Sequence, residues 1–230
     1  MMRILKAFAV LLHYPGRDLQ LHAGELEGMI RGDPRLSAPT RDEIVDFLRV
    51  MRRRDLMDQQ ADYVGLFDRS RSLSLHLFEH VHGESRDRGQ AMVELQEAYH
   101  EAGFAVAVSE LPDYLPLFLE YCSLLPEAEA IDWLERSGHL LQTLEARLVR
   151  RQSGYAALFR GLLEIGDLEL LEPELRRRID QESRDDTPEA LDRVWQEEPV
   201  TFGPTEGCGG AKTHTGQAVP VDVSRLGGQG

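Results

Sequence analysis

Apolar residues recur with the spacing of an α-helix along almost the whole chain up to about residue 180. Residues three and four positions apart lie on the same face of a helix, so each such run predicts a helix with one face in a shared core. The runs cover residues 4–12, 19–30, 44–51, 56–67, 86–102, 115–124, 134–148 and 155–162. The alternating run at 72–77 is too short and isolated to form a sheet, and we expect a turn that leads into a helix there. The sequence therefore predicts an all-α protein, built as a single multi-helix bundle with short connections.

Local signals predict where several helices begin and end. Thr40 followed by Glu43 has the pattern of a capping box, which would start a helix at that point. Asp113 is expected to cap the strongly apolar helix that follows it, with Pro116 in the first turn. Gly103 is expected to end the helix before it. Because the helix after Asp113 is apolar nearly all round, we expect it at the centre of the bundle.

The composition changes after the helical region. The chain is first strongly acidic and then, over 199–230, contains eight glycines and three prolines with almost no periodicity. Such a segment cannot bury enough apolar surface to offset the roughly 1–2 kcal/mol per residue that ordering the backbone costs. We therefore expect a helical domain over 1–180 and a largely disordered tail over 181–230. Trp195 and Phe202 are exceptions that could hold part of the tail on the bundle or contact a partner.

The charge balance limits the classes of partner. Acidic residues outnumber Lys and Arg by 40 to 26, for a net charge of −14. Such a surface repels phosphate backbones and would attract a basic peptide, although acidity can equally serve only to keep a protein soluble. Cys122 and Cys208 lack the spacing of a disulfide framework or a zinc site, which is consistent with a reducing cytoplasm. No run approaches the roughly 20 apolar residues of a membrane span, and the first residues predict a core helix rather than a signal peptide.

The sharpest enzyme-like signal is His76, Glu79 and His80, which match the H-x-x-E-H pattern of inverzincin peptidases. On a helix, the two histidines would lie one turn apart on one face, where they could bind zinc beside Glu79 as a general base. His82 adds a third imidazole. However, three fixed positions arise readily by chance, and no second motif selects a further ligand. In the simpler alternative these histidines lie at a helix end and hydrogen-bond to neighbouring groups. A zinc-dependent hydrolase is thus an alternative hypothesis.

A second unusual segment follows in the chain. Glu110, Asp113 and Glu120 place carboxylates around an apolar helix. If that region lines a groove, it would suit a peptide that is both apolar and basic. A well-capped core helix is the alternative, and periodicity alone favours it.

These segments together resemble the NarJ family. The match includes Leu11-Leu12-x-Tyr14-Pro15, residues 74–92, residues 110–116 and residues 119–121, and it runs from about residue 3 to 165. The characteristic residues of the long match are His76, Glu79, His80, His82, Gly83, Arg86, Asp87 and Arg88. This long match is far more specific than the zinc pattern that it contains. NarJ proteins are assembly chaperones of respiratory nitrate reductase, within the TorD-like group of molybdoenzyme chaperones.

The resemblance implies an all-α bundle of the TorD-like type that performs no catalysis and uses no metal or cofactor of its own. Proteins of this family bind the cytoplasmic apoenzyme, chiefly the N-terminal segment of its catalytic subunit. They keep it competent to receive the molybdenum cofactor and iron–sulfur clusters before membrane docking, and they are not permanent subunits. We hypothesise that apolar anchors and carboxylates of the second segment bind this peptide. The anchors are Tyr114, Leu115, Phe118 and Leu119, and the carboxylates are Glu110, Asp113 and Glu120. Core packing is the competing role for Leu115 and Leu119.

Overall fold

The computed structural model describes residues 2–81, 86–106, 110–187, 189–190 and 192. Within these residues the chain is helical, and the only β-type pairing is an isolated bridge between His76 and Tyr114. The α-helices are α1 (Arg3–Leu12), α2 (Arg17–Gly32), α3 (Ala38–Arg53), α4 (Leu56–Tyr63), α5 (Leu77–Val81), α6 (Arg86–Glu101), α7 (Leu115–Leu124), α8 (Glu127–Arg136), α9 (Gly138–Arg150), α10 (Ala156–Ile165) and α11 (Pro173–Gln181). A π-helix (η1, Val64–Asp68) follows α4, and a 3-10 helix (η2, Arg71–Leu73) precedes α5. The predicted all-α fold is confirmed.

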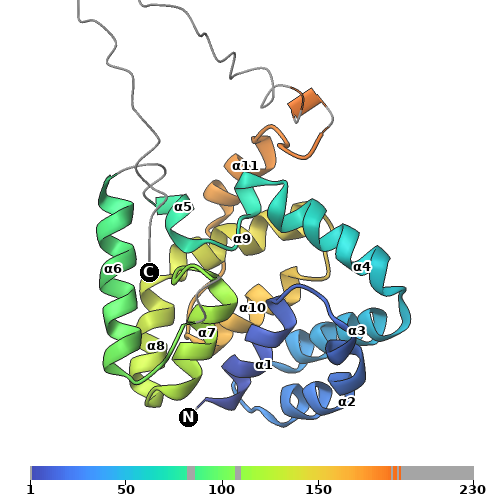
Figure 1. Cartoon of the computed structure of the whole chain (residues 1–230). Coiled ribbons are helices and arrows are strands. Elements are labelled where there is room, and N and C mark those ends of the chain that lie inside the picture. Colours follow the sequence, from blue (N-terminus) through green and yellow to red (C-terminus); the bar gives the residue numbers. More distant parts are fainter. Residues whose placement is uncertain (1, 82–85, 107–109, 188, 191, 193–230) are drawn as a thin grey trace, which may run out of the picture.

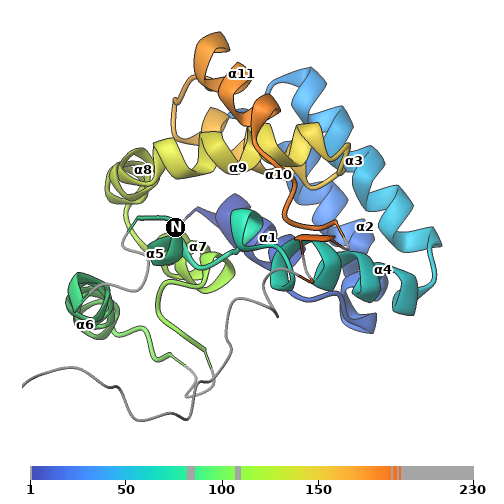
Figure 2. The same ribbon diagram turned by 90° about the horizontal axis from the view of Figure 1, so that it is seen from above.

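The core of the bundle lies between α1, α7, α9 and α10 (Figure 1). Helix α1 packs against α7 and α2, while α10 packs against α9 and α3. Leu5, Phe8 and Leu12 of α1 are completely buried, and burial of each such side chain contributes about 1.5–3 kcal/mol. Helices α2, α3 and α4 lie to one side of this core, and α6 and α8 lie to the other (Figures 1 and 2). Helix α11 packs on α9.

The start of α3 differs from the predicted capping box. Ser37 is the N-cap, and its hydroxyl oxygen accepts a hydrogen bond from the backbone N–H of Thr40 at 3.4 Å. Thr40 already lies inside the helix, and its hydroxyl donates to Glu164 at 2.7 Å. Glu164 also accepts the hydroxyl of Ser37 at 2.7 Å. The prediction that Thr40 caps the helix was therefore wrong, because Ser37 has both the extended backbone and the free acceptor that a cap needs.

Helix α7 was predicted to be central, and it is. Phe118, Tyr121 and Cys122 are buried, and Pro116 lies in the first turn as expected. Leu124, at the end of the helix, is 41% exposed. The prediction that Asp113 caps this helix was wrong: the helix begins at Leu115 without a side-chain cap.

The described part of the acidic segment contacts the bundle. Arg147 of α9 pairs with Glu182 at 2.9 Å. Arg151, just after α9, pairs with Asp185 and, at 3.3 Å, with Asp186. Trp195, Phe202 and Cys208 lie outside the described residues. No helix in the described ranges is both long enough and apolar enough to cross a membrane.

Candidate functional site

The two segments with the strongest sequence signals lie side by side. His76 and Tyr114 form an antiparallel bridge. On either side of it, the N–H of Leu115 donates to the carbonyl of Leu75 at 2.8 Å, and the N–H of Leu77 donates to the carbonyl of Asp113 at 3.0 Å. Backbone hydrogen bonds thus hold the residues that precede α5 beside the residues that precede α7. We call the group formed by His13, Tyr63, His76, Asp113 and Tyr114 the junction.

Asp113 is the buried polar centre of the junction. Its side chain is fully buried, and its Oδ1 lies 3.2 Å from Nδ1 of His76. Its Oδ2 accepts a hydrogen bond from the backbone N–H of Phe78 at 3.1 Å. That N–H belongs to the first turn of α5, where a helix has no acceptor of its own. Asp113 therefore accepts a hydrogen bond from a free N–H at the start of α5, a helix distant in sequence, rather than from one at the start of α7.

Tyr114 joins the first helix to the junction. Its hydroxyl lies 3.0 Å from that of Tyr63, which donates to the carbonyl of Leu12 at 2.9 Å. Its ring lies with centroid distances of 5.5 Å to His13 and 5.4 Å to His76. Three of the segments that carry the family resemblance, residues 11–15, 74–92 and 110–116, therefore meet at this point. Tyr63 and His13 were not among the predicted site residues, because nothing local in the sequence indicates their partners.

The two histidines of the zinc-like motif sit in different environments. The hydrogen bond with Asp113 raises the pKa of His76 above its ordinary value, although partial burial opposes this. Burial lowers the pKa of His80, and its Nε2 donates to the carbonyl of Ser74 at 2.8 Å. The structure thus favours charge on one ring and neutrality on the other.

This geometry does not support the zinc hypothesis. His76 precedes α5, so the expectation that it shares a helical face with His80 was wrong. Each ring already has a different partner, and Glu79 is exposed and lies 3.4 Å from Arg88. Among the described residues, no group of three His, Cys, Asp or Glu side chains could hold a metal ion. His82 and Gly83 lie outside the described residues, as do the side chains of Arg86 and Asp87.

The predicted apolar anchors divide into two groups. Leu115 and Leu119 are completely buried in the core, so neither side chain can touch a ligand in this conformation. Tyr114 is half-buried at the junction. Phe118 is 2% exposed and lines a cavity.

The predicted carboxylates divide in a similar way. Asp113 is enclosed within the junction. Glu110 is half-buried near Tyr114, whose pKa its charge helps to raise after the larger effect of burial. Glu120 is partly exposed and pairs with Lys6 at 3.2 Å. Only Glu110 and Glu120 are therefore placed to meet a charged partner at the surface.

A cavity of about 640 Å³ lies beside the junction and is lined by residues of α5, α6, α7, α8 and α9. Its apolar lining comes from Leu77, Phe78, Leu95, Phe118, Trp133 and Leu140. The rings of Phe118 and Trp133 meet edge to face, with centroids 5.9 Å apart. Arg136 and Arg147 also line it, but they pair with Asp132 at 2.7 Å and Glu182 at 2.9 Å. The cavity is therefore suited mainly to apolar side chains. Sequence analysis did not identify Trp133 or Leu140, whose helical spacing is that of ordinary core residues.

Known proteins resemble this chain over most of its length. Residues 33–160 match the family model described as nitrate reductase delta subunit. The nitrate reductase molybdenum cofactor assembly chaperone NarJ of Escherichia coli (strain K12) is 46% identical over 199 residues, which are 86% of this chain and 84% of that protein. The probable nitrate reductase molybdenum cofactor assembly chaperone NarW of the same strain is 42% identical over 201 residues, which are 87% of this chain and 84% of that protein.

Two more distant likenesses were found. The probable nitrate reductase molybdenum cofactor assembly chaperone NarJ of Bacillus subtilis (strain 168) is 27% identical over 159 residues, covering 68% of this chain and 84% of that protein. The crystal structure of a putative redox enzyme maturation protein from Archaeoglobus fulgidus aligns with a TM-score of 0.49 and 24% identity, over 70% of this chain and 91% of that one. The names of the similar E. coli proteins describe assembly chaperones rather than catalysts. With close identity over most of both chains, the protein belongs to the NarJ family of molybdoenzyme assembly chaperones, as its sequence indicated.

Proposed function

We propose that this protein is a dedicated assembly chaperone of a respiratory nitrate reductase and acts in the cytoplasm. It binds the apo catalytic subunit, chiefly the N-terminal segment, and keeps it competent to receive the molybdenum cofactor and iron–sulfur clusters before membrane docking. It then leaves the mature enzyme. The observation that carries the proposal is the meeting of three family segments, residues 11–15, 74–92 and 110–116, at one junction beside an apolar cavity. The names of the relatives support the choice of client.

The cavity supplies the apolar part of the binding site in this proposal. An amphipathic helix places apolar side chains on one face, and a groove between helices can accept that face. Phe118 and Trp133 form one wall, and aromatic side chains provide large contact areas at low entropic cost. Leu115 and Leu119 pack in the core and do not line the cavity.

The charged part of the site assists recognition of a basic peptide. The net charge of −14 accelerates encounters with a positively charged ligand. Glu110 and Glu120 are the predicted carboxylates with access to the surface. Asp113 has a different part in the proposal: it keeps α5 in position at one wall of the cavity.

Calorimetry with a synthetic peptide from the start of the nitrate reductase catalytic subunit tests the proposal. Thr143 lines the cavity and is partly exposed, so Thr143→Trp should fill the space without disturbing the core. We expect the affinity to fall roughly tenfold or more, which corresponds to about 1.4 kcal/mol. Glu135→Trp adds the same ring at an exposed position of α8 outside the cavity and should leave the affinity unchanged. Equal affinity for the parent and Thr143→Trp would exclude the cavity as the site.

A second calorimetric comparison tests the charges. Glu110→Lys and Glu120→Lys should each weaken binding, and added salt should narrow the difference from the parent protein, because salt screens exposed charges. Asp46→Lys, an exposed reversal in α3, is the matched control for net charge. If all three variants weaken binding equally, net charge matters but the two predicted carboxylates have no special position.

A further inference from the structure

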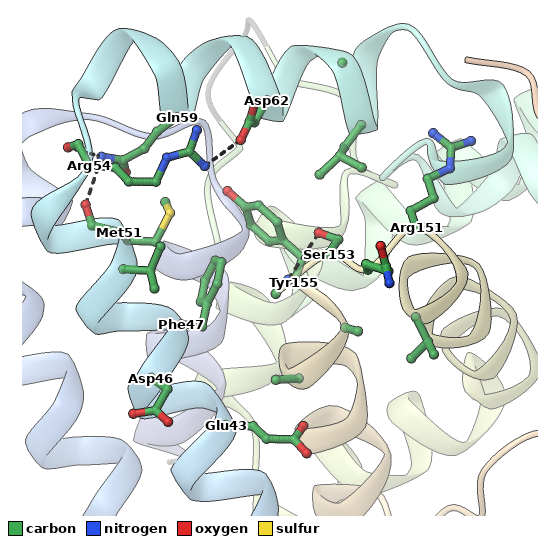
Figure 3. A pocket seen from close by; sticks show the side chains of 18 of the residues that line it. Glu43, Asp46, Phe47, Met51, Arg54, Gln59, Asp62, Arg151, Ser153 and Tyr155 are labelled. Atoms are coloured by element: carbon green, nitrogen blue, oxygen red, sulfur yellow. Dashed lines mark hydrogen bonds and ion pairs between the residues drawn. The ribbon is translucent and has the colours of Figure 1, made fainter. Parts of the chain in front are cut away.

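A larger cleft, of about 930 Å³, opens between α3, α4 with η1, and the start of α10. It shares no lining residue with the cavity beside the junction. Phe47, Val50, Met51 and Leu66 provide apolar walls, and Val50 is 52% exposed. Figure 3 shows the Tyr155 ring among these walls, where its centroid lies 4.8 Å from that of Phe47.

Two buried oxygen atoms in this cleft lack hydrogen-bond partners among the described residues. Gln59 is 2% exposed, and its Nε2 donates to the carbonyls of Met51 at 2.8 Å and Arg54 at 2.9 Å (Figure 3). Its Oε1 accepts nothing, and the hydroxyl of buried Tyr155 is also unpartnered. Buried polar atoms are nearly always hydrogen-bonded in folded proteins. A ligand with an apolar body and a hydrogen-bond donor would therefore fit this cleft, because the donor could bind one of these two oxygens.

The chain itself leads to this cleft. Asp186 and Arg151 both line it, and Arg151 pairs with Asp185 and Asp186 and donates to Ser70 at 2.9 Å. These contacts hold the end of the acidic segment at the edge of the cleft. Beyond Asp186 the chain turns, with the N–H of Ala190 donating to the carbonyl of Thr187 at 3.0 Å. Trp195 follows Asp192 by three positions, which span at most roughly 10 Å. The segment around Trp195 therefore continues from a part of the chain that is already held at the edge of the cleft.

We propose that the C-terminal segment around Trp195 docks in this cleft. An indole has a large apolar surface and a single N–H that only donates, which complements the apolar walls and the free oxygens of Gln59 and Tyr155. Glu197 and Glu198 follow directly. At the rim they meet Arg69, which lines the cleft and forms no ion pair within the described part of the chain.

Tryptophan fluorescence of the full chain tests this docking. The protein contains two tryptophans, so Trp133→Phe leaves Trp195 as the only emitter. We expect blue-shifted emission and weak quenching by acrylamide, compared with free N-acetyltryptophanamide. Val50→Glu, added to this background, places a carboxylate in the apolar wall at an exposed position. It should shift the emission to the red and raise the quenching constant severalfold. Leu21→Glu, at a site in α2 that is 77% exposed, should change neither.

Further variants test the two hydrogen-bonding residues, and dilution tests whether a second copy of the chain occupies the cleft instead. Tyr155→Phe and Gln59→Leu should each increase the quenching of Trp195 by acrylamide. Thermal melting of both variants identifies the temperatures at which they are folded, and the quenching is measured there. Quenching of Trp195 as strong as that of the free indole, or no change on Val50→Glu, would overturn the proposal. Protection that disappears on dilution would also overturn it, because the occupant would then be a second copy of the chain.

Discussion

Asp113 links two segments that are 35 residues or more apart in the chain: its Oδ1 lies 3.2 Å from Nδ1 of His76, and its Oδ2 accepts the N–H of Phe78 at 3.1 Å. Asp113→Ala would leave a buried N–H and an imidazole without their acceptor. We expect the free energy of unfolding to fall by about 2–3 kcal/mol, measured by urea denaturation. Asp132→Ala removes an exposed pair with Arg136 and should cost less than about 1 kcal/mol. Similar losses for both variants would contradict the role given to Asp113.

The same contact predicts a pH dependence of stability. Since folding raises the pKa of His76, its contribution is fully present below the unfolded pKa of about 6.5 and is lost as pH rises through the higher folded value. His80 behaves in the opposite way, because its folded pKa is lowered and its contribution is lost as pH falls from about 6.5 through that lower value. The difference between the parent protein and His76→Gln isolates the first effect. That difference should shrink with rising pH in denaturation measured across neutral pH, and a constant difference would contradict it.

Substitution of Leu119 tests whether this residue packs in the core or contacts the ligand. Its side chain is completely buried, so Leu119→Ala should lower the free energy of unfolding by about 2–5 kcal/mol. The affinity of the folded variant for the client peptide should stay unchanged. Calorimetry at a temperature where circular dichroism shows the variant to be folded makes the comparison. A marked loss of affinity there would restore Leu119 as a direct anchor.

Substitution of Glu145 tests how α9 is joined to the neighbouring helices α10 and α11. Glu145 is completely buried, accepts from Arg160 at 3.0 Å, and also binds Arg176 of α11. Glu145→Gln leaves two guanidinium groups without a shared counter-ion. Because both arginines are partly exposed, we expect a loss of about 2 kcal/mol, below the range for a fully buried pair. Glu43→Gln removes the exposed partner of the same Arg160 and should cost less than about 1 kcal/mol. A loss for Glu43→Gln as large as for Glu145→Gln would contradict this account.

Periodicity predicted the helical fold because core-facing positions repeat regularly along most helices, as in α2, where Leu19, Ala23, Leu26 and Ile30 are the buried residues. Local signals correctly predicted that Gly103, with a φ of 72°, follows the end of α6, but they did not predict the N-caps of α3 and α7. A side-chain oxygen binds whichever free N–H is near in space, and for Asp113 that group belongs to Phe78, in another segment. A local sequence pattern describes only residues that are adjacent in the chain, so it cannot identify an N–H group that is brought close by folding. The π-helix at Val64–Asp68 also has no signal in the apolar spacing.

The candidate site was predictable only in part. The motif at 76–80 and the segment at 110–116 were identified from the sequence, but their pairing and the contribution of Tyr63 depend on tertiary structure. An apolar residue that contacts a ligand and one that packs in the core have the same helical spacing. Sequence alone therefore could not separate Phe118, which lines the cavity, from Leu119, which does not.

The molybdenum content of nitrate reductase, purified from cells that lack this protein, tests the central claim most directly. Each sample comes from cells supplied with the parent chain, Thr143→Trp, Glu135→Trp or no chain. The account predicts loaded enzyme with the parent and Glu135→Trp, and enzyme depleted of molybdenum with Thr143→Trp or without the chain. Enzyme with full molybdenum content in the absence of the chain would contradict the proposed function. Full content with Thr143→Trp alone would leave the function standing and contradict the cavity as its site.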